Sequence, residues 1–420
     1  MLVLLYHIFL GLFRLSIWLA APFHRKARQW IRGRRGVLDY LAQNITADDK
    51  VIWMHCASLG EFEQGRPLLE SLRSQYPRYR ILLTFFSPSG YEVQKHYKGA
   101  DWVCYLPLDG PRTAKKFLSL THPELVIFVK YEFWFFYLKK IFYQKIPLLL
   151  VSALFRKEMN FFRWYGALSR KMLGRFQHVF VQNESSLQLL EPLGVRQISS
   201  VAGDTRFDRV LTISKQSLPI EEIETFLAGY PGLIAGSTWP ADEVALRDAL
   251  SDVSLAGLKL IIAPHEISPG HLHALKLLFP NAIRYSQWNK EKSDAMVLII
   301  DNYGMLSRLY RHGTMAYVGG GLHKEGIHNT LEAAVYSIPV IVGPHHTKHA
   351  EATDLIRIGG AFSFQKEHPS TDLKKILLQL LHHPEHCKRA GQIAGDYVQE
   401  NAGATQRILC YIQEKRLLIN

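Results

Sequence analysis

Short apolar runs alternate with segments of helical periodicity along most of the chain. The runs have the length of buried strands, and the segments between them, such as 61–75, 241–250 and 271–278, place apolar residues at helical spacing. This alternation predicts parallel sheets whose strands are joined by crossover helices. We predict strands at residues 51–57, 81–85, 103–106, 125–129, 148–153 and 178–181, and then at 233–235, 258–263, 296–300, 315–318 and 340–342.

The predicted strands form two sets, with no strand expected between them. The 420 residues, 48% of them hydrophobic, are enough for two cores of ordinary domain size. We predict an α/β protein of two facing doubly wound Rossmann-like domains, which would bind ligands at the carboxyl ends of the strands in the cleft between them. The predicted limits are 36–210 for the first domain, 211–232 for a linker and 233–420 for the second, whose final helix can pack back on the first.

The N-terminus is apolar and is followed by a basic cluster. Residues 1–23 are interrupted only by His7 and Arg14, and no acid occurs before Asp39. The cluster consists of Arg25, Lys26, Arg28, Arg32, Arg34 and Arg35. This order predicts a membrane-associated anchor, residues 1–35, with the rest of the chain in the cytoplasm. A spanning helix and a helix lying in the interface, with Arg14 reaching the surface, both fit; an ordinary buried helix fits less well.

Charge and cysteine usage narrow the functional classes. The net charge of +13 draws the chain to nucleic acid or to anionic membrane, and the apolar N-terminus favours membrane. The cysteines are scattered without a CxxC pair, which disfavours a disulfide framework or metal finger and favours a reducing compartment. His345, His346 and His349 could bind a metal ion, although solvated or ligand-facing histidines fit this spacing better.

The run VGGGLHKEGIHNTLEAA, residues 318–334, carries the clearest chemical signal. It predicts a buried strand, a glycine turn and a helix over 330–336, with Asn329 as N-cap and Glu332 completing a capping box. Free amides and the helix dipole would together attract an anion. The spacing is neither GxGxxG nor GxxxxGK[ST], so we predict a phosphate-holding element of another kind. A tight turn without a ligand is the alternative.

Charged side chains also follow the strands of the first domain. Glu61 ends the sequence HCASLGE and opens the next helix, where it could accept a proton from a bound hydroxyl or serve only the helix dipole. Glu132 lies in KYEFW after a predicted strand, where pairing with a cation is the simpler role. Arg206, in GDTRFD, closes the domain near the predicted cleft. In the second domain, residues 236–238 and Pro264-His265 end strands.

In order along the chain, these motifs resemble those of the 3-deoxy-D-manno-octulosonic acid (Kdo) transferases. These are GT-B glycosyltransferases that move Kdo from CMP-Kdo to a lipid A precursor. The resemblance covers nearly the whole chain: the apolar N-terminus, Ser-x-Gly-Glu, Glu-x-Trp, Gly-x-x-x-Phe-Asp, Gly-Ser-Thr and Gly-Gly-x-Leu…Gly-x-His-Asn-x-Leu-Glu. It implies an inverting enzyme of lipopolysaccharide biosynthesis at the cytoplasmic face of the inner membrane.

The resemblance also implies the partners and the site. The partners would be CMP-Kdo, the lipid A precursor and anionic inner-membrane lipids, with no nucleic acid, no metal and no other cofactor. Glu61 matches the general base, Glu132 a residue of the transition state, and Arg206 a basic residue that is typically Lys. The CMP contacts map to Pro264, His265, Tyr303, Gly304, Met305, Asn329, Thr330, Leu331 and Glu332.

Some positions depart from the family pattern. His265 replaces a common Arg, Met305 a common Glu and Thr330 a common Pro, while Arg206 keeps the charge of Lys with a different donor geometry. The CMP assignment therefore depends most on residues 329–332. Two other classes stay open: a GT-B transferase or epimerase that uses a UDP-sugar, and a non-enzymatic binder of anionic membrane.

Overall fold

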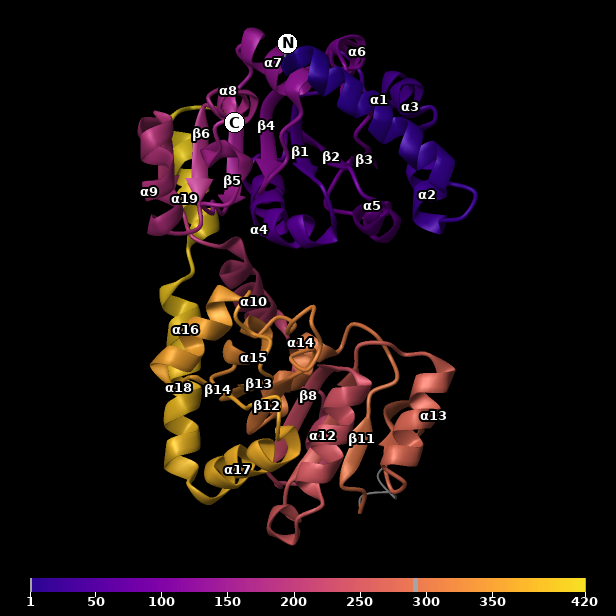
Figure 1. The fold of residues 1–420 in the computed structure, drawn as a ribbon, viewed down its shortest axis with the longest axis vertical. Coiled ribbons are helices and arrows are strands. Elements are labelled where there is room, and N and C mark those ends of the chain that lie inside the picture. Colours follow the sequence, from indigo (N-terminus) through magenta and orange to yellow (C-terminus); the bar gives the residue numbers. More distant parts are fainter. Residues whose placement is uncertain (1, 290–293, 420) are drawn as a thin grey trace. The chain divides into compact units, whose positions relative to one another are not determined.

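The computed structural model describes residues 2–289 and 294–419. Met1 of the predicted anchor, and residues 290–293 and Asn420 of the predicted second domain, lie outside the described residues. The chain forms two compact units (Figure 1). The first unit comprises Met1–Arg209 with Ala402–Asn420, and the second comprises Val210–Asn401.

Within the described residues, each unit contains one parallel sheet of seven strands. The sequence pattern predicted the two parallel sheets, with six strands in the first and five in the second. The first sheet has the order β3-β2-β1-β4-β5-β6-β7, so its strand order reverses between β1 and β4. Its strands are β1 (Val51–Cys56), β2 (Arg80–Phe85), β3 (Trp102–Tyr105), β4 (Pro123–Val129), β5 (Leu148–Ala153), β6 (His178–Val181) and β7 (Ser199–Val201).

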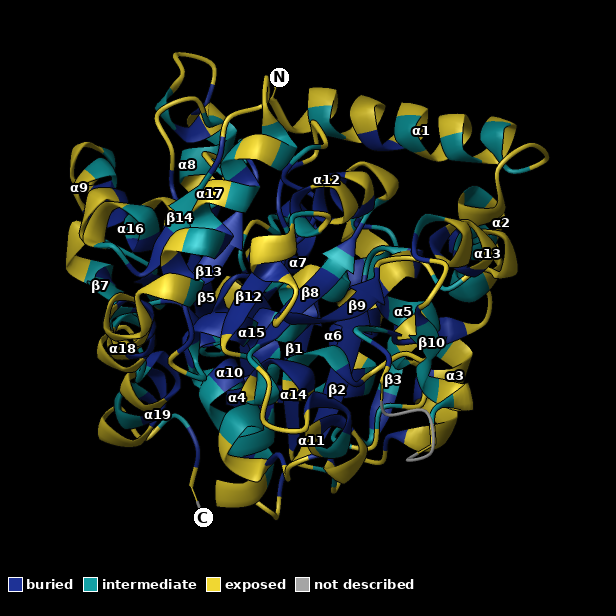
Figure 2. Ribbon diagram, turned by 90° about the horizontal axis from the view of Figure 1, so that it is seen from below, coloured by how far each residue is buried: buried dark blue, intermediate teal, exposed yellow. Residues whose placement is uncertain are grey.

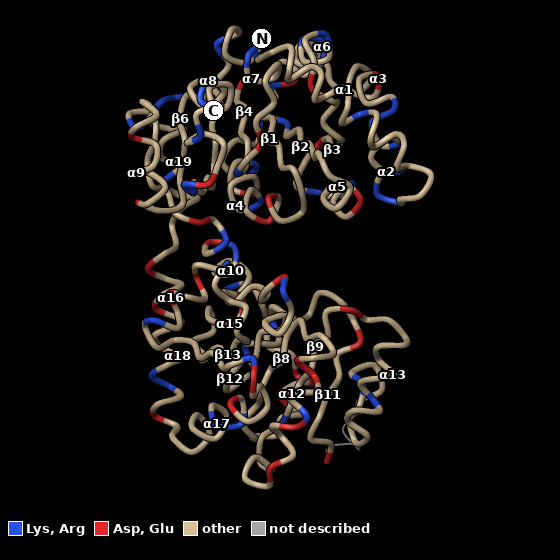
Figure 3. Tube along the Cα trace, viewed as in Figure 1, with Lys and Arg blue, Asp and Glu red and all other residues tan. Residues whose placement is uncertain are grey.

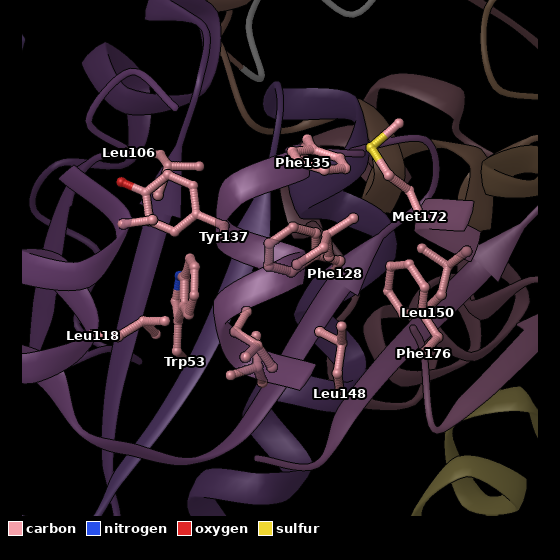
Figure 4. Packing of buried hydrophobic residues seen from close by; sticks show 14 of the residues in the cluster. Trp53, Leu106, Leu118, Phe128, Phe135, Tyr137, Leu148, Leu150, Met172 and Phe176 are labelled. Atoms are coloured by element: carbon pink, nitrogen blue, oxygen red, sulfur yellow. The ribbon is translucent and has the colours of Figure 1, made fainter. Parts of the chain in front are cut away.

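Both faces of the first sheet are buried, because alternate residues of each strand join opposite cores. Trp53 and Phe128 belong to the core that Tyr137 completes, shown in Figure 4. Met54 and Ile127 belong to the core on the other face. The helices of this unit are α1 (Leu2–Ala20), α2 (Arg25–Arg34), α3 (Val37–Asn44), α4 (Leu59–Gln75), α5 (Pro88–Gln94), α6 (Pro111–Thr121), α7 (Phe135–Tyr143), α8 (Ala167–Leu173), α9 (Glu184–Leu190) and α19 (Ala404–Glu414). Helix α10 (Thr205–Gln216) begins in this unit and continues into the second.

The apolar helix α1 lies along the first unit (Figure 2). Its length and composition would allow it to cross a membrane. One side of it nevertheless packs on the unit: the Tyr6 hydroxyl donates to Asp109 Oδ2 at 2.8 Å, and Phe13 stacks on Phe86. The opposite side is exposed and apolar, with Leu12 61% and Trp18 65% accessible. In the structure, α1 therefore has one side docked on the first unit and an exposed apolar side.

The second sheet has the order β10-β11-β9-β8-β12-β13-β14. Its strands are β8 (Gly232–Thr238), β9 (Lys259–Pro264), β10 (Ile283–Arg284), β11 (Val297–Ile299), β12 (Met315–Val318), β13 (Val340–Val342) and β14 (Ala361–Ser363). The helices are α11 (Glu221–Leu227), α12 (Pro240–Leu250), α13 (Pro269–Leu278), α14 (Leu306–Leu309), α15 (Leu331–Ala334), α16 (Ala350–Ile358), α17 (Pro369–His382) and α18 (Pro384–Glu400). Residues 211–232, which we predicted to be a linker, contain the end of α10 and all of α11.

The last helix, α19, completes the first unit. It packs on α4, and Ile408 and Ile412 enter the same core as Met54. Asp208 holds the start of this helix: its Oδ1 accepts from the Gly403 amide at 2.6 Å and its Oδ2 from the Thr405 amide at 2.7 Å. A carboxylate at a helix N-terminus satisfies amides that have no partner in the helix and favours the helix dipole.

We predict that Asp208→Ala lowers the free energy of unfolding by about 1–2 kcal/mol, because two amides at the start of α19 lose their acceptor. Urea denaturation followed by circular dichroism measures this change. Asp396→Ala, at an exposed position of α18, is the matched control and is expected to change stability by less than about 0.5 kcal/mol. Equal effects of the two substitutions would contradict the capping role.

Candidate active site

Glu132 is held at the carboxyl edge of the first sheet by two side chains. Its Oε2 lies 3.1 Å from His55 Nε2 and accepts from Trp134 Nε1 at 2.5 Å. His55, fully buried at the end of β1, places Nδ1 2.8 Å from Thr84 Oγ1, which itself accepts from Trp53 Nε1 at 2.8 Å. If His55 carries its proton on Nε2, every donor in this series of hydrogen bonds has an acceptor, and the Glu132 carboxylate is fixed in position.

Glu61 lies in the first turn of α4, directly after β1. Its Oε2 accepts from the Ser58 hydroxyl, and Ser58 is the N-cap residue of the helix. Burial raises the pKa of the Cys56 thiol, and the charges of Glu61 and Glu132 raise it further. Glu61 follows β1, and Glu132 follows β4, which pairs with β1. The structure brings these two sequence-predicted residues to one edge of the sheet, at the point where the strand order reverses.

Arg206 lies at the beginning of α10 and is oriented by Asp204. Its Nε and Nη2 each lie 2.8 Å from Asp204 Oδ2, and its amide donates to Oδ1 at 2.9 Å. Burial raises the pKa of the Tyr131 hydroxyl, and the charges of Arg156, Glu61 and Asp204 act on the same group. Asp204 thus fixes the side chain of Arg206 at the start of α10.

Three non-glycine residues at strand ends have left-handed backbone angles. Lys130 follows β4 with φ 61°, Ser152 lies in β5 with φ 54°, and Ser237 lies in β8 with φ 53°. The pairing of β5 with β6 and of β8 with β9 is irregular at the two serines. Such conformations cost about 1–3 kcal/mol each and are concentrated at functional sites. Here they redirect the chain where the strands leave the buried sheets.

The carboxyl edge of the second sheet carries a stack of aromatic rings. Trp239 stacks on His265 with centroids 4.7 Å apart, and His265 stacks on His328 at 4.5 Å. Trp239 Nε1 also donates to His328 Nε2 at 3.2 Å. The ring centroids of Trp239 and His323 are 5.1 Å apart. Of these residues, only His265 was a sequence-predicted site residue, because the others are brought together by contacts between distant segments.

The buried Asp242 joins this edge to the glycine turn. Its Oδ2 accepts from the amides of Gly320 and Trp239, each at 2.9 Å, and its Oδ1 accepts from the Tyr317 hydroxyl at 2.7 Å. The Gly319 amide donates to the Gly236 carbonyl at 2.9 Å. Our prediction of free amides was therefore wrong for Gly319 and Gly320, because protein acceptors already satisfy both.

The glycines are required by close backbone packing instead. A Cβ on Gly319 would lie 2.3 Å from the Ser237 carbonyl oxygen, and a Cβ on Gly321 would lie 2.5 Å from Gly343 Cα. Gly320 has φ 90°, a conformation that favours glycine. The close approach that the sequence predicted is thus present, but it is an approach between strand ends of the protein itself.

The helix after the glycine turn is shorter than predicted. We predicted 330–336 with Asn329 as N-cap; α15 begins at Leu331, and its N-cap is Thr330. Asn329 still acts beside it: its Oδ1 accepts from the Leu331 amide at 3.2 Å and its Nδ2 donates to Glu332 Oε1 at 3.0 Å. Thr330 is fully buried, and within the described residues its hydroxyl has no hydrogen-bond partner. A helix of one turn has little dipole, so the anion attraction here depends on individual groups.

The remaining predicted contacts lie on two neighbouring loops. Tyr303 is 74% exposed, and its hydroxyl accepts from the Ile267 amide at 3.1 Å, two residues after His265. Gly304 has φ 88°, and Met305 is buried at the start of α14. Tyr303 therefore connects the loop after β11 to the loop after β9, where Pro264 and His265 lie.

Sequence reasoning missed a second buried carboxylate at this edge. Glu243 is 3% exposed, accepts from Thr238 Oγ1 at 2.9 Å and lies 2.9 Å from His271 Nε2. It supports the turn that follows β8. The sequence contains a pattern that could have predicted this carboxylate: Thr238 ends the Gly-Ser-Thr motif, and two acids follow it at the start of a helix.

We predict that His328 stays neutral well below the pH at which an ordinary histidine is protonated. Burial, with the charges of His265 and His349, lowers its pKa to about 4, and its Nε2 must keep a lone pair to accept from Trp239. Because the unfolded side chain has a pKa of about 6.5, His328 contributes stability above pH 6.5 that is lost as the pH falls towards 4. An NMR titration of ¹⁵N-labelled histidine rings measures this, with His328→Gln identifying the signal. A midpoint near 6.5 would contradict the contact with Trp239.

Comparison with known proteins agrees with the motif order. Residues 30–209 match the family described as 3-deoxy-D-manno-octulosonic-acid transferase (kdotransferase). The chain is 28% identical over 358 residues to the 3-deoxy-D-manno-octulosonic acid transferase of Aquifex aeolicus, which covers 83% of this chain and 92% of that protein. It is 27% identical over 369 residues to the enzyme of the same name from Haemophilus influenzae, covering 85% of each.

Solved structures share the fold at low sequence identity. The UDP-GlcNAc 2-epimerase from Neisseria meningitidis bound to UDP-GlcNAc has a TM-score of 0.61 and 17% identity, and covers 87% of this chain and 100% of that chain. MurG from Acinetobacter baumannii has a TM-score of 0.52 and 13% identity, and the match covers 87% of this chain and 99% of that chain. These likenesses show a GT-B-like fold, as the sequence predicted. The sequence matches show that the chain is similar to the 3-deoxy-D-manno-octulosonic acid transferases over most of its length.

Proposed function

We propose that this enzyme transfers Kdo from CMP-Kdo to a lipid A precursor in lipopolysaccharide biosynthesis, with inversion at the anomeric carbon. Similarity to the 3-deoxy-D-manno-octulosonic acid transferases supports the sugar and its nucleotide donor. The observation that carries the mechanism is the placement of Glu61 after β1 and of Glu132 after the neighbouring β4, at the strand-order reversal of the first sheet. Parallel α/β sheets bind ligands at this place.

Glu61 is the proposed general base. Its carboxylate takes the proton of the acceptor hydroxyl, whose oxygen then bonds to the anomeric carbon of Kdo. The bond between that carbon and the phosphate oxygen breaks, and CMP leaves with the electron pair. The Ser58 hydroxyl donates to Oε2 of Glu61, so it orients the carboxylate while the second oxygen is kept for the substrate.

Glu132 is the proposed electrostatic partner of the transition state. As CMP departs, positive charge develops at the sugar centre, and a fixed carboxylate nearby stabilises it without reorganisation. His55 and Trp134 supply the fixation, because both contact Oε2 of Glu132. Arg206, held by Asp204, is proposed to stabilise negative charge on the substrates.

The donor nucleotide is proposed to bind at the carboxyl edge of the second sheet. Residues 329–332 and the loops bearing Pro264–His265 and Tyr303–Met305 would contact CMP. Support comes from the way Asn329 organises the start of α15 and from the contact between Tyr303 and Ile267. The amides of Gly319 and Gly320 have no part in this proposal, since Asp242 and Gly236 occupy them.

We further propose that α1 lies in the cytoplasmic face of the inner membrane and does not cross it. Support comes from the polar anchor between Tyr6 and the buried Asp109, which holds one side of α1 on the first unit. The exposed apolar side would enter the bilayer interface, and the basic residues of α2, marked blue in Figure 3, would meet anionic lipid. The acceptor lipid would then be reached from the same surface.

We expect Glu61→Gln to reduce turnover by at least about a hundredfold and to leave CMP binding unchanged, because the amide cannot accept the proton. Mass spectrometry of a lipid A precursor after incubation with CMP-Kdo measures turnover. Glu63→Gln is the control, because Glu63 pairs with Arg66 at 3.8 Å and with Arg209 at 3.7 Å and has no proposed part in the reaction. Near-normal turnover of the Glu61 variant would remove it from the mechanism.

For the donor site, we expect Asn329→Ala to weaken CMP binding by about tenfold, because the start of α15 loses two side-chain hydrogen bonds worth about 0.5–1.5 kcal/mol each. Calorimetric titration measures the affinity, with Asn281→Ala at an exposed position as control. The same titration with UDP tests the alternative of a UDP-sugar enzyme, which the shared fold of the epimerase keeps open. Tighter binding of UDP than CMP would favour that alternative.

A further inference from the structure

The carboxyl edge of the second sheet, where the donor nucleotide is proposed to bind, has little permanent positive charge. The five adjacent strands β11, β9, β8, β12 and β13 are followed there by the loops 300–305, 265–268, 239, 319–330 and 343–349. These loops contain two lysines, Lys324 and Lys348, and three acids, Glu266, Asp301 and Glu325. With every histidine neutral, their net charge is −1. Such an edge repels a phosphate unless a further cation is supplied.

Backbone amides do not supply the missing charge. Those of Gly319 and Gly320 already donate to Gly236 and Asp242, and α15 is a helix of one turn. The same loops nevertheless carry six histidines: His265, His323, His328, His345, His346 and His349. Histidine gains a positive charge near neutral pH, so the cation that a phosphate requires can come from protonation at this edge.

His328 is unsuited to carrying this charge. Its Nε2 accepts from Trp239 Nε1 at 3.2 Å, so this nitrogen must keep its lone pair. Burial, with the charges of His265 and His349, lowers the pKa of His328 to about 4. His328 therefore stays neutral and offers a flat ring, on which His265 stacks with centroids 4.5 Å apart.

His265 is suited to it. The side chain is exposed, and within the described residues its ring takes part in no hydrogen bond or ion pair. The backbone is fixed, because the His265 amide donates to the Thr238 carbonyl at 3.0 Å. The ring stacks on Trp239 with centroids 4.7 Å apart and an interplanar angle of 23°. A tryptophan face attracts a cation, and an imidazolium has two N–H donors for phosphate oxygens.

Other charged groups around His265 leave this role open. Asp242 and Glu243 of α12 are buried and already engaged, Asp242 by three donors and Glu243 by Thr238 and His271. The remaining charged and titratable groups of the five loops are Glu266, Asp301, Tyr303, His323, Lys324, Glu325, His345, His346, Lys348 and His349. The acids favour a proton on His265 and the basic groups oppose it, so the negative charge of a bound phosphate would decide the balance.

We propose that His265 binds the phosphate of the donor nucleotide as an imidazolium, with Trp239 as the positioning residue, and that binding takes up one proton from solution. The proton goes to the unprotonated ring nitrogen of His265, and no other bond is made or broken. The inference rests on the proposed donor site and deepens it, because it names the group that neutralises the phosphate. Since the bound state holds more protons than the free state, donor affinity falls as the pH rises.

The test is calorimetric titration of the full chain with CMP, in a neutral detergent at pH 7.5, in Tris, HEPES and MOPS buffers. These buffers differ in their heat of ionisation, so the slope of the observed enthalpy against that heat gives the number of protons taken up. At this pH an ordinary histidine is about 10% protonated, and a phosphate monoester is almost wholly the dianion. We expect uptake of about 0.5–0.9 proton per CMP, and an affinity that falls about fivefold from pH 7 to pH 8.

Two substitutions at the exposed His265 separate the charge from the proton. His265→Arg supplies a permanent cation, and we expect it to bind CMP within about threefold of the wild-type affinity, without proton uptake and without the pH dependence. His265→Gln supplies no charge. We expect it to lose the uptake and to weaken binding at pH 7.5 by about tenfold, the scale of a lost hydrogen bond to a charged group.

Trp239→Leu tests the positioning role through the pH profile. Removing the ring beneath the cation is expected to weaken CMP binding by about fivefold at pH 7, and by less at pH 8.5, where histidine is neutral. A purely structural role would give equal losses at both pH values. His273→Gln is the matched control, because His273 is an exposed histidine of α13, and we expect its proton uptake to equal that of the wild type.

Four results would overturn the proposal. Uptake that persists in His265→Arg would place the proton on the nucleotide. Uptake that is lost in His323→Gln but kept in His265→Gln would assign it to the other exposed imidazole near Trp239. Equal losses of Trp239→Leu at pH 7 and pH 8.5 would remove the positioning role. CMP binding without uptake would overturn this inference alone, whereas a chain that does not bind CMP would contradict the proposed donor site as well.

Discussion

The burial of both faces of each parallel sheet is the constraint on which the rest of the structure depends. Every residue of β1 is buried, and the same holds for β5. Polar side chains can therefore act on a substrate only where the strands end. Glu61, Glu132 and Arg206 follow strands of the first sheet, as Trp239, His265 and His328 follow strands of the second. The chemistry is confined to these edges because the interior excludes it.

Hydrophobic pattern was enough to predict most of the fold, because both sheets are made of continuous apolar runs. The strands that it missed, β7, β10 and β14, have two or three residues each, and sheet partners determine them more than their own sequence does. The motifs lie at the carboxyl edges of the two sheets for a similar reason, since each follows a strand. Which groups contact one another was beyond sequence reasoning: Trp239 and His328 are 89 positions apart, and His55 and Glu132 are 77 apart.

The glycine turn shows the limit of motif reasoning most clearly. Three glycines before a helix indicated a close backbone approach, which is present, and free amides, which are not, because Asp242 reaches Gly320 from 78 positions away. The N-terminal helix α1 shows the same limit. Its composition fits both a spanning and a surface helix, and the contact on which our proposal of a surface helix rests joins Tyr6 to Asp109 across 103 positions.

The return of the chain to the first unit has a consequence for synthesis. Ile408, Leu409, Ile412 and Leu418 belong to the core that also contains Met54 and Ile127. During translation, this core stays incomplete until residues 404–418 have left the ribosome, whereas the second unit, Val210–Asn401, is contiguous and can close its core earlier. A chain that lacks residues 404–418 would expose one apolar face of the first sheet, which makes it a target for the cell's quality control.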